Sequence, residues 1–382
     1  MKTAKLGILI ACLICAGTIL AYYSTPGNLP AWAPLNLTRE MDELSVGQYT
    51  AVVDQQGRIV SKLGRHVYKG DEIISANGEQ YRVISVKGNI AKARMVGLDR
   101  DLLAYMEYFD QYALPAQAGK KRSGAVAIYH SHSDESYVPT DGTSSRPGNG
   151  GIYRVGSTLS AALRDKGVRP IHSFATHDPH DAQAYMRSRK TAVQLMKRNP
   201  SALIDVHRDG IPDASFYRHS INGREVSQVR LVIGNQNPNF SANRDFAKRL
   251  MAFANKTHPG LVKEIFVGRG NYNQDLMPTA ILIEAGTHTL RREEAQDGIA
   301  LLAETIPTVL GVSPAVTPRT GTPAGVWTAL LWILALTIIG AGIFLVVSAG
   351  GVKQAQEKLG RFFSKEIGLK LNNRKEGGEG ER

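Results

Sequence analysis

Cysteine is almost absent from this sequence. Its 382 residues include only two, Cys12 and Cys15, and both lie in one apolar segment near the N-terminus. The rest of the chain therefore has no disulfide bond and no cysteine ligand for zinc. Any metal site in the folded part must be built from histidine, aspartate or glutamate.

Acidic residues are outnumbered by basic ones. The chain has 46 Lys and Arg against 34 Asp and Glu, which gives a formal net charge of +12. This balance favours an anionic partner: a nucleic acid, a phospholipid surface or an acidic cell-wall polymer. The 43% of hydrophobic residues and 21% of charged residues are ordinary for a globular protein. The length suffices for two modest domains with additional segments.

Two apolar segments contain no charged residue and predict membrane helices. The first covers residues 6–23 and follows Lys2 and Lys5. No clear A-x-A cleavage site follows it, so we expect an uncleaved anchor at 1–23, with a cleaved signal peptide as the alternative. The second, at 326–349, is long enough to span the hydrocarbon core of a bilayer.

Lysine and arginine near the two segments predict the topology. Lys2 and Lys5 precede the first segment, and the second is followed by Lys353, Lys358, Arg361, Lys365 and Lys370. By the positive-inside rule both termini lie in the cytoplasm, and residues 24 to about 325 lie outside it. We therefore expect a cell-membrane protein with an extracytoplasmic domain. This placement disfavours nucleic acid and favours the cell wall as partner.

The first part of the exposed region predicts a stalk and a β-rich module. Residues 24–48 contain proline and are polar at first, which is typical of a stalk. Residues 49–98 alternate short apolar runs with pairs such as Asn77-Gly78, a pattern typical of β-hairpins. We therefore expect a small β-rich module at 49–110. It has no catalytic cluster, so we expect it to act as a spacer or to dock a partner.

From about residue 121 the pattern changes to apolar strands that alternate with helical stretches. This alternation predicts an α/β domain at 121–310, with a mostly parallel sheet covered by helices on both faces. Residues 311–325 are rich in Pro, Thr and Gly and predict a linker. Residues 350–382 predict a basic cytoplasmic tail.

Three predicted strands of the α/β domain end in ionisable residues. The carboxyl ends of parallel strands meet at one edge of a sheet, where ligands of open α/β sheets bind. We therefore expect these side chains to lie together. They are His130, His132, Asp134 and Glu135 after "AVAIY", Asp205, His207, Arg208 and Asp209 in "ALIDVHRD", and Glu284 and His288 in "TAILIEAGTH".

The ionisable residues at these strand ends predict a metal site. His132-x-x-Glu135, with His207 later in the chain, matches zinc ligation by two histidines and a carboxylate, with one position open for water. A metal lowers the pKa of such a water to about 7. Glu284 is then the expected general base and acid. An ionised glutamate after an apolar run also needs a cation nearby, which the metal supplies.

The remaining polar residues receive lesser roles. We expect His130 to face the substrate or support the site, and Asp205 to orient an imidazole. The other histidines of the α/β domain are expected in loops or on the surface, outside the site; they are His172, His177, His180, His219 and His258.

Several long motifs resemble the stage II sporulation protein P family of cell-wall hydrolases. They are "IYHSHSDESY", "MRSRKTAVQLMKRNPSALIDVHRDG", "HPGLVKEI", "NYNQDL" and "ILIEAGTHTL", in order over about residues 121–310. The family is similar in turn to zinc-dependent N-acetylmuramoyl-L-alanine amidases, and His132, His207 and Glu284 match the places that carry their chemistry. Those amidases take a metal glutamate from just before the first helix. This chain has "GGIYRVGS" there, so Glu135 is the best substitute.

The resemblance implies an amidase-like fold and a Zn²⁺-dependent amidase that cuts between N-acetylmuramic acid and the stem peptide of peptidoglycan. It also implies endopeptidase activity on cross-links, and a role in forespore engulfment, in the space between the forespore and mother-cell membranes. The implied partner is the stage II sporulation protein D, a lytic transglycosylase. Substrate contacts are implied for Asn271, Asn273 and Gln274, with a structured loop as the alternative. The second apolar segment departs from the family, in which we expect only the N-terminal anchor.

Two other functions stay open at this point. A zinc carboxypeptidase or LD-type peptidase would act on the stem peptide and need a cationic clamp for a terminal carboxylate, for which Arg208 or Arg269 could serve. A metal-bound scaffold that only binds the wall is the non-enzymatic alternative. That scaffold is expected to lack a general base, yet Glu284 is present.

Overall fold

The computed structural model describes residues 43–111, 124–181, 183–312 and 324–357. The chain divides into two units, Met1–Ala315 and Val316–Arg382. The predicted anchor at 1–23 lies outside the described residues, as does most of the predicted stalk, linker and tail. The second unit contains helix α8 (Ala324–Ala349), where the second membrane helix was predicted. In the part of the chain that the structure describes, no helix combines the length and hydropathy that a membrane span requires. The transmembrane prediction is therefore not supported.

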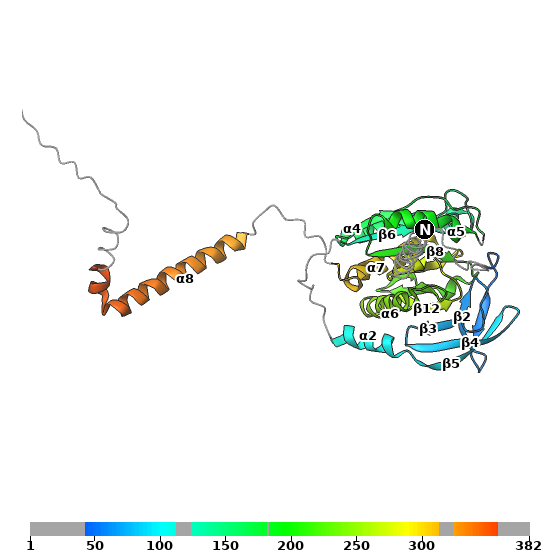
Figure 1. Cartoon of the computed structure of the whole chain (residues 1–382), viewed down its shortest axis with the longest axis horizontal. Helices are drawn as coiled ribbons and strands as arrows, with labels where there is room; N and C mark the ends of the chain where they lie inside the picture. Colours follow the sequence, from blue (N-terminus) through cyan, green and yellow to red (C-terminus); the bar gives the residue numbers. More distant parts are fainter. Residues whose placement is uncertain (1–42, 112–123, 182, 313–323, 358–382) are drawn as a thin grey trace, which may run out of the picture. The chain divides into compact units, whose positions relative to one another are not determined.

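One sheet of 11 strands forms the centre of the first unit (Figure 1). In sheet order its strands are β2 (Ile59–Leu63), β1 (Thr50–Val53), β5 (Ile90–Leu98), β4 (Glu79–Lys87), β3 (Glu72–Ser75), β12 (Val262–Gly268), β11 (Val229–Gly234), β13 (Ala280–Thr287), β8 (Ala202–Asp209), β6 (Ala125–Tyr129) and β7 (Arg169–His172). From β12 to β7 all neighbours pair in parallel except β11 with β13. The prediction of an α/β fold with a mostly parallel sheet is confirmed for this part.

The strands of the predicted β-rich module belong to the same sheet. β3 pairs antiparallel with β12, in register from Glu264 with Ser75 to Val267 with Glu72. The helix that follows β5, α2 (Arg100–Gln111), packs against α6 (Phe240–Thr257). Residues 49–110 thus extend the sheet of the α/β part and share its helical layer.

Helices cover both faces of the α/β part. On one face α4 (Ile152–Asp165), α7 (Arg292–Val309), α6 and α2 lie in succession, and α5 (Ala184–Met196) covers the other face (Figure 1). Strand β6 shows why both faces are apolar: Val126 and Ile128 join the core under α4 and α7, while Ala127 joins the core that includes Leu195 of α5. All residues of β6, β8, β11 and β13 are buried, as expected for strands covered on both sides.

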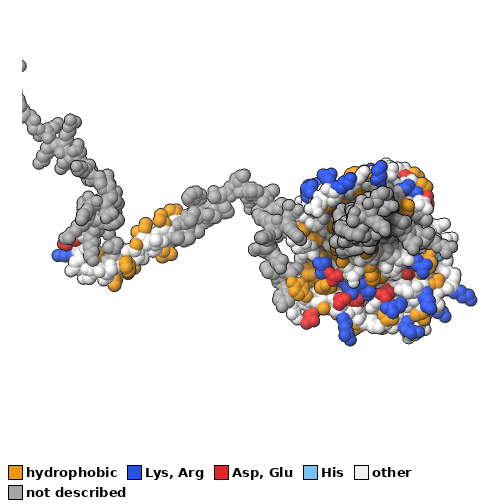
Figure 2. Space-filling view, in the orientation of Figure 1, with side chains coloured by type: hydrophobic (Ala, Val, Ile, Leu, Met, Phe, Trp, Pro, Cys, Tyr) orange, Lys and Arg blue, Asp and Glu red, His pale blue; other side chains and the backbone are white. Residues whose placement is uncertain are grey.

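Smaller elements complete the first unit. They are α3 (Val138–Asp141), the two-stranded sheet of β9 (Arg218–Ile221) and β10 (Arg224–Ser227), and the 3-10 turns η1 (Ala214–Phe216) and η2 (Gln274–Leu276). On the face drawn in Figure 2, basic side chains are spread over the upper and lower edges of this unit, with acidic ones between them. The positive charge is therefore not gathered into one patch on that face.

Register brings the predicted site residues to one edge of the sheet. β6, β8 and β13 are adjacent and parallel, with Tyr129 opposite Asp205 and Glu284 opposite His207. The loop after β6 therefore starts beside the end of β8. The convergence of these strand ends, predicted from the sequence, is confirmed.

Candidate metal centre

His132, Glu135 and His207 converge at the carboxyl edge of the sheet. Glu135 Oε1 lies 3.6 Å from His132 Nδ1 and 3.5 Å from His207 Nδ1. The two imidazole rings have their centroids 4.9 Å apart and are nearly perpendicular. All three side chains are 1% exposed. Two histidine nitrogens thus face one carboxylate oxygen in a site that water barely reaches.

Unpaired nitrogen atoms indicate what this site is built to hold. Among the described residues, both ring nitrogens of His132 and Nδ1 of His207 are buried without a hydrogen-bond partner. A buried polar atom left unpaired costs about 1–3 kcal/mol. In a tetrahedral zinc site with bonds of about 2.0–2.1 Å, neighbouring ligand atoms are about 3.3–3.4 Å apart. The distances of 3.5 and 3.6 Å to Glu135 approach this spacing, so the three residues fit a divalent metal ion.

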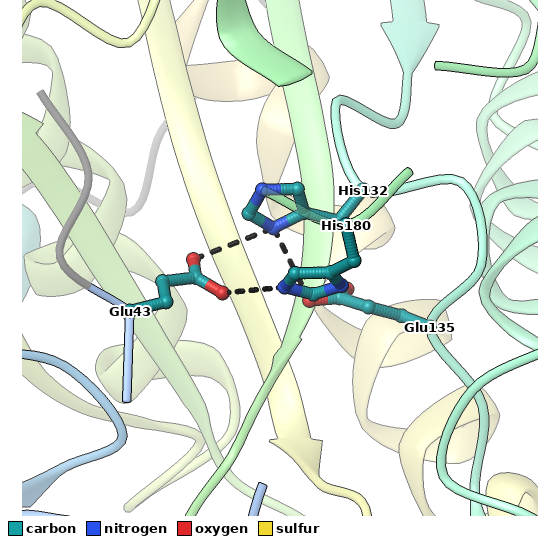
Figure 3. Close-up of side chains that lie close together, drawn as sticks. All are labelled: Glu43, His132, Glu135 and His180. Carbon is teal, nitrogen blue, oxygen red and sulfur yellow. Dashed lines mark hydrogen bonds and ion pairs between the residues drawn. The ribbon is translucent and has the colours of Figure 1, made fainter. Parts of the chain in front are cut away.

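Glu43 is a carboxylate at this site that the sequence did not reveal. Its Oε1 lies 3.3 Å from His132 Nδ1, and its Oε2 accepts a hydrogen bond from His180 Nε2 at 2.8 Å (Figure 3). Glu43, His132, Glu135 and His180 each place a possible ligand atom within 4.8 Å of the others. Glu43 comes from the segment predicted as a stalk, and nothing in its local sequence distinguishes it.

The group of four and the predicted trio share His132 and Glu135 but differ in their other members. His180 has both ring nitrogens engaged, Nδ1 with Asp134 at 3.0 Å and Nε2 with Glu43. His207 instead keeps Nδ1 free and directed at Glu135. A free, buried nitrogen is the better ligand, which favours His207 over His180; the trio of His132, Glu135 and His207 stays a prediction. Glu43 then lies where a fourth ligand would be.

His180 was expected outside the site and lies within it. Its ring stacks on that of His132, with centroids 3.9 Å apart. Burial opposes the charged form of His180, but its hydrogen bonds with Asp134 and Glu43 outweigh this and raise its pKa to about 10. The loop that carries it has no apolar periodicity, so its approach to His132 could not be predicted from the sequence.

Asp205 orients His207, as expected. Its Oδ1 lies 2.9 Å from His207 Nε2, and Ser131 Oγ lies 2.8 Å from the same nitrogen. This leaves Nδ1 free to bind a metal ion. Burial opposes a charge on His207, but Asp205 and Glu135 raise its pKa well above the ordinary range. The surroundings of His207 thus stabilise positive charge, which a metal cation would also supply.

Glu284 lies beside His207 but belongs to a different network. It is buried, with Oε1 2.8 Å from Arg65 Nη2 and Oε2 2.6 Å from Arg230 Nη1. The Tyr217 hydroxyl donates to Oε2 at 3.2 Å. Two arginines compensate its charge, and it is not part of the ligand group. This geometry agrees with a non-ligand role; general-base catalysis by Glu284 stays a prediction.

Arg208 lines a cavity of about 300 Å³ at the metal centre, together with His132, His180 and the segment Glu43–Val46. Its backbone N–H donates to Glu135 Oε2 at 2.9 Å, which fixes that carboxylate. Its Nε is buried without a partner among the described residues. Arg208 is therefore placed to meet a molecule in the cavity.

His130 lies under helix α4, away from this cavity. Its Nδ1 is 2.8 Å from the Val206 carbonyl oxygen, and its Nε2 is 2.8 Å from His172 Nε2. It is fully buried and does not line the cavity. The expected contact with substrate has no support in this geometry, because side chains alternate along the strand and His130 follows the face of Ile128.

The loop before β13 contains Asn271, Asn273 and Gln274, which were predicted to contact substrate. All three are buried. Asn273 donates to Ser188 Oγ of α5 at 3.2 Å, and Gln274 accepts from the Gly234 N–H at 2.9 Å. Both amide atoms of Asn271 are buried without a partner in the described structure. None of the three lines the cavity. The contacts of Asn273 and Gln274 correspond to the alternative of a structured loop.

Comparisons with known proteins place the chain among sporulation proteins. The family model described as Stage II sporulation protein P matches residues 67–307. The Stage II sporulation protein P of Bacillus subtilis (strain 168) is 30% identical over 195 residues, 45% of this chain and 47% of that protein. The match thus spans about half the length of that relative. The N-acetylmuramoyl-L-alanine amidase AmiC2 of Nostoc punctiforme aligns over 50% of this chain and 98% of that one, at 17% identity and a TM-score of 0.30.

Proposed function

Because the chain belongs to the stage II sporulation protein P family, we propose that it is a peptidoglycan hydrolase that remodels the cell wall during sporulation. The observation that supports a hydrolase best is the trio of His132, Glu135 and His207. Their buried donors converge beside a cavity, and two of them leave ring nitrogens unpaired. Three protein ligands with room for a fourth are the arrangement of catalytic rather than structural zinc sites.

The proposed reaction is hydrolysis of the amide bond between N-acetylmuramic acid and L-Ala of the stem peptide. Zn²⁺ held by His132, Glu135 and His207 would supply a Lewis acid for the carbonyl group and activate a water. Asp205 holds the ring of His207 in place. Glu284 accepts the proton of the attacking water and returns it to the leaving nitrogen. Cutting of peptide cross-links by the same site is a further proposal.

We also propose that the domain acts outside the cytoplasm, where peptidoglycan is found, and that it works with the stage II sporulation protein D, a lytic transglycosylase. A net charge of +12 suits an anionic wall polymer. One observation favours the peptidase alternative. Arg208 lines the cavity and could bind a terminal carboxylate, whereas Arg269, the other candidate clamp, stacks over the ring of Tyr68.

Digestion of purified peptidoglycan by the full chain tests the proposal. Stem peptides released with a new amino terminus at L-Ala, identified by mass, support the amidase. Cleavage within glycan-linked stem peptides supports the peptidase instead. Binding to the wall without any release, equal for the wild type and His207→Ala, would leave only the scaffold function.

A further inference from the structure

A loop from the β-rich part of the chain reaches the metal centre. Gly64 follows β2, and its N–H donates to Asp209 Oδ1 at the end of β8, at 2.8 Å. A Cβ at Gly64 would lie 2.5 Å from that oxygen and 2.7 Å from the Gly210 nitrogen. Only glycine permits this approach, which carries the next residue, Arg65, to the edge of the sheet. Arg65 is 7% exposed.

One guanidinium nitrogen of Arg65 faces two carboxylates. Nη2 lies 2.8 Å from Glu284 Oε1 and 3.7 Å from Glu43 Oε1. The other terminal nitrogen, Nη1, donates to the Tyr272 hydroxyl at 3.3 Å. Arg65 therefore connects the proposed general base with the carboxylate that lies beside the metal ligands. The charge of Arg65 is permanent.

The carboxylate of Glu43 presents two oxygens on one carbon, as a reacting amide does once a water has added to it. Its Oε1 is 3.3 Å from His132 Nδ1, the spacing of neighbouring ligand atoms, and its Oε2 is 2.8 Å from His180 Nε2. Hydrolysis of an amide passes through a carbon that carries two such oxygens. The Glu43 carboxylate therefore stands in for these oxygens, and the groups around it are those that would meet them.

We propose that Arg65 is a catalytic residue that donates to the carbonyl oxygen of the scissile amide, and that Glu43 occupies this oxygen's position until substrate displaces it. This inference rests on the proposed function. In the reaction, water adds to the carbonyl carbon and the C–N bond breaks. The water's proton passes to the leaving nitrogen, and a carboxylic acid and an amine result. Arg65 stabilises the negative charge on the carbonyl oxygen and is unchanged at the end.

The contact of 3.7 Å from Arg65 to Glu43 is longer than a hydrogen bond. Catalytic hydrogen bonds are often long in a free enzyme and tighten only in its complex with substrate. Both residues precede the segment that the family model matches, residues 67–307. The assignment gives the strands β1 and β2 a part in the chemistry, whereas the sequence suggested only a spacer or a docking module.

Binding of acetohydroxamic acid to the cobalt-loaded full chain tests this proposal without peptidoglycan. The probe offers two oxygens to a metal, and visible absorption of Co²⁺ reports its binding. We expect Arg65→Met to weaken binding about 10-fold or more, as expected for a lost charge-assisted hydrogen bond. Glu43→Ala should strengthen binding, because it removes the competing carboxylate. Arg58→Met is the matched control and should bind as the wild type, since Arg58 lies in the turn between β1 and β2 and its side chain is 74% exposed.

Arg65→Lys is a second variant that keeps the test decisive if Arg65→Met does not fold. It retains the charge beside Glu284 but loses the planar fork of donors. We expect it to bind the probe more weakly than the wild type, with full cobalt content. On peptidoglycan, Arg65→Lys and Arg65→Met should lower kcat, with about a 10²- to 10³-fold loss for Arg65→Met and little change in KM.

Wild-type binding of the probe by Arg65→Lys and by folded Arg65→Met would overturn the proposal. So would loss of cobalt from Glu43→Ala, because Glu43 would then be a required ligand. If the wild type released no stem peptide, the proposed function would fail while the probe titration still decided the role of Arg65.

Discussion

At the scale of single residues, hydrogen-bond partners distinguish ligands from supporting groups. His180 and His207 both lie beside His132, yet His180 has partners at both nitrogens and His207 at only one. A metal ion competes poorly for an imidazole whose two nitrogens are each already bound to a carboxylate. The same reasoning separates Glu135 from Glu284, whose oxygens are bound by two arginines.

Glu284→Gln tests the proposed general base. Glutamine preserves the shape of the side chain but cannot take a proton, so we expect a folded protein that retains its metal and cuts peptidoglycan about 10²- to 10⁴-fold more slowly. Some stability should be lost, because Arg65 and Arg230 each lose a charged partner. Cleavage rate and metal content are measured on the same preparation.

Two results would contradict this role. Cleavage at the wild-type rate would mean that another group is the base, with Asp134 or Asp209 as the next candidates. Loss of metal would make Glu284 a ligand. The exposed Glu107→Gln, at a residue of α2, is a control for the loss of a carboxylate alone.

His172 should make the free energy of unfolding depend on pH. Burial, and to a lesser degree His130, lower its pKa to about 3 in the folded protein. Since an unfolded histidine has a pKa of about 6.5, the unfolded chain binds more protons between these values, and stability falls as the pH drops from about 6.5 towards 3. Urea unfolding at pH 7 and pH 5.5 should show a loss from this residue of about 1 kcal/mol. His172→Gln should reduce the loss, and an unchanged pH dependence would contradict the assignment.

Part of the site could be predicted from single residues and part could not. His132 follows the apolar strand β6, and His207 and Glu284 lie near the ends of β8 and β13, so the register of these strands leaves little freedom in where they lie. Glu43 and His180 come from segments without apolar periodicity. Their positions depend on contacts between distant parts of the chain, which no local pattern records.

At the scale of elements, the fit of α4 against the sheet positions the layer beneath the site. A Cβ at Gly156 would lie 2.6 Å from two ring atoms of His130 and 2.7 Å from His172 Nε2. The glycine thus allows the helix to approach β6 and β7 closely. The same approach buries the pair of histidines that follow these strands.

Gly156→Ala should therefore destabilise the protein. In a free helix alanine is favoured over glycine by about 1 kcal/mol. Here a contact of 2.6 Å is a clash, and forced repacking typically costs about 1–3 kcal/mol. We expect the clash to outweigh the helix preference, with a lower urea midpoint. Arg154→Ala, at an exposed position of α4, is the control and should change the midpoint little. Stabilisation by Gly156→Ala would show that the helix and strand are not packed this closely.

The sequence predicted the alternation of strands and helices but not how all strands associate. Glycine-containing turns in residues 49–98 indicate hairpins, and β3, β4 and β5 do pair with their sequence neighbours. The pairing of β3 with β12 joins segments far apart in the chain. Without this pairing, β3 would be the edge strand of the β-rich part and β12 the edge strand of the α/β part. Backbone hydrogen bonds between two such strands leave no pattern in either sequence.

At the scale of the whole first unit, the continuous sheet links the metal centre to the β-rich strands. β3 hydrogen-bonds β12, and Arg65 joins the loop after β2 to Glu284 on β13. Loading the centre with metal should therefore stabilise residues on both sides of this connection. A spacer module folded by itself would not respond in this way.

Removal of the metal by a chelator tests this link. Without metal the centre holds unpaired buried nitrogens and close carboxylates, so thermal unfolding should shift to lower temperature. A metal present at 1,000 times its Kd contributes about 4 kcal/mol of stability. Because one sheet carries both parts, we expect a single transition before and after chelation. His207→Ala should melt as the chelated wild type does and respond little to chelator or added Zn²⁺, because its ligand set is incomplete. A melting curve in which only one of two separate transitions shifts with metal would mean that the β-rich strands fold independently of the centre.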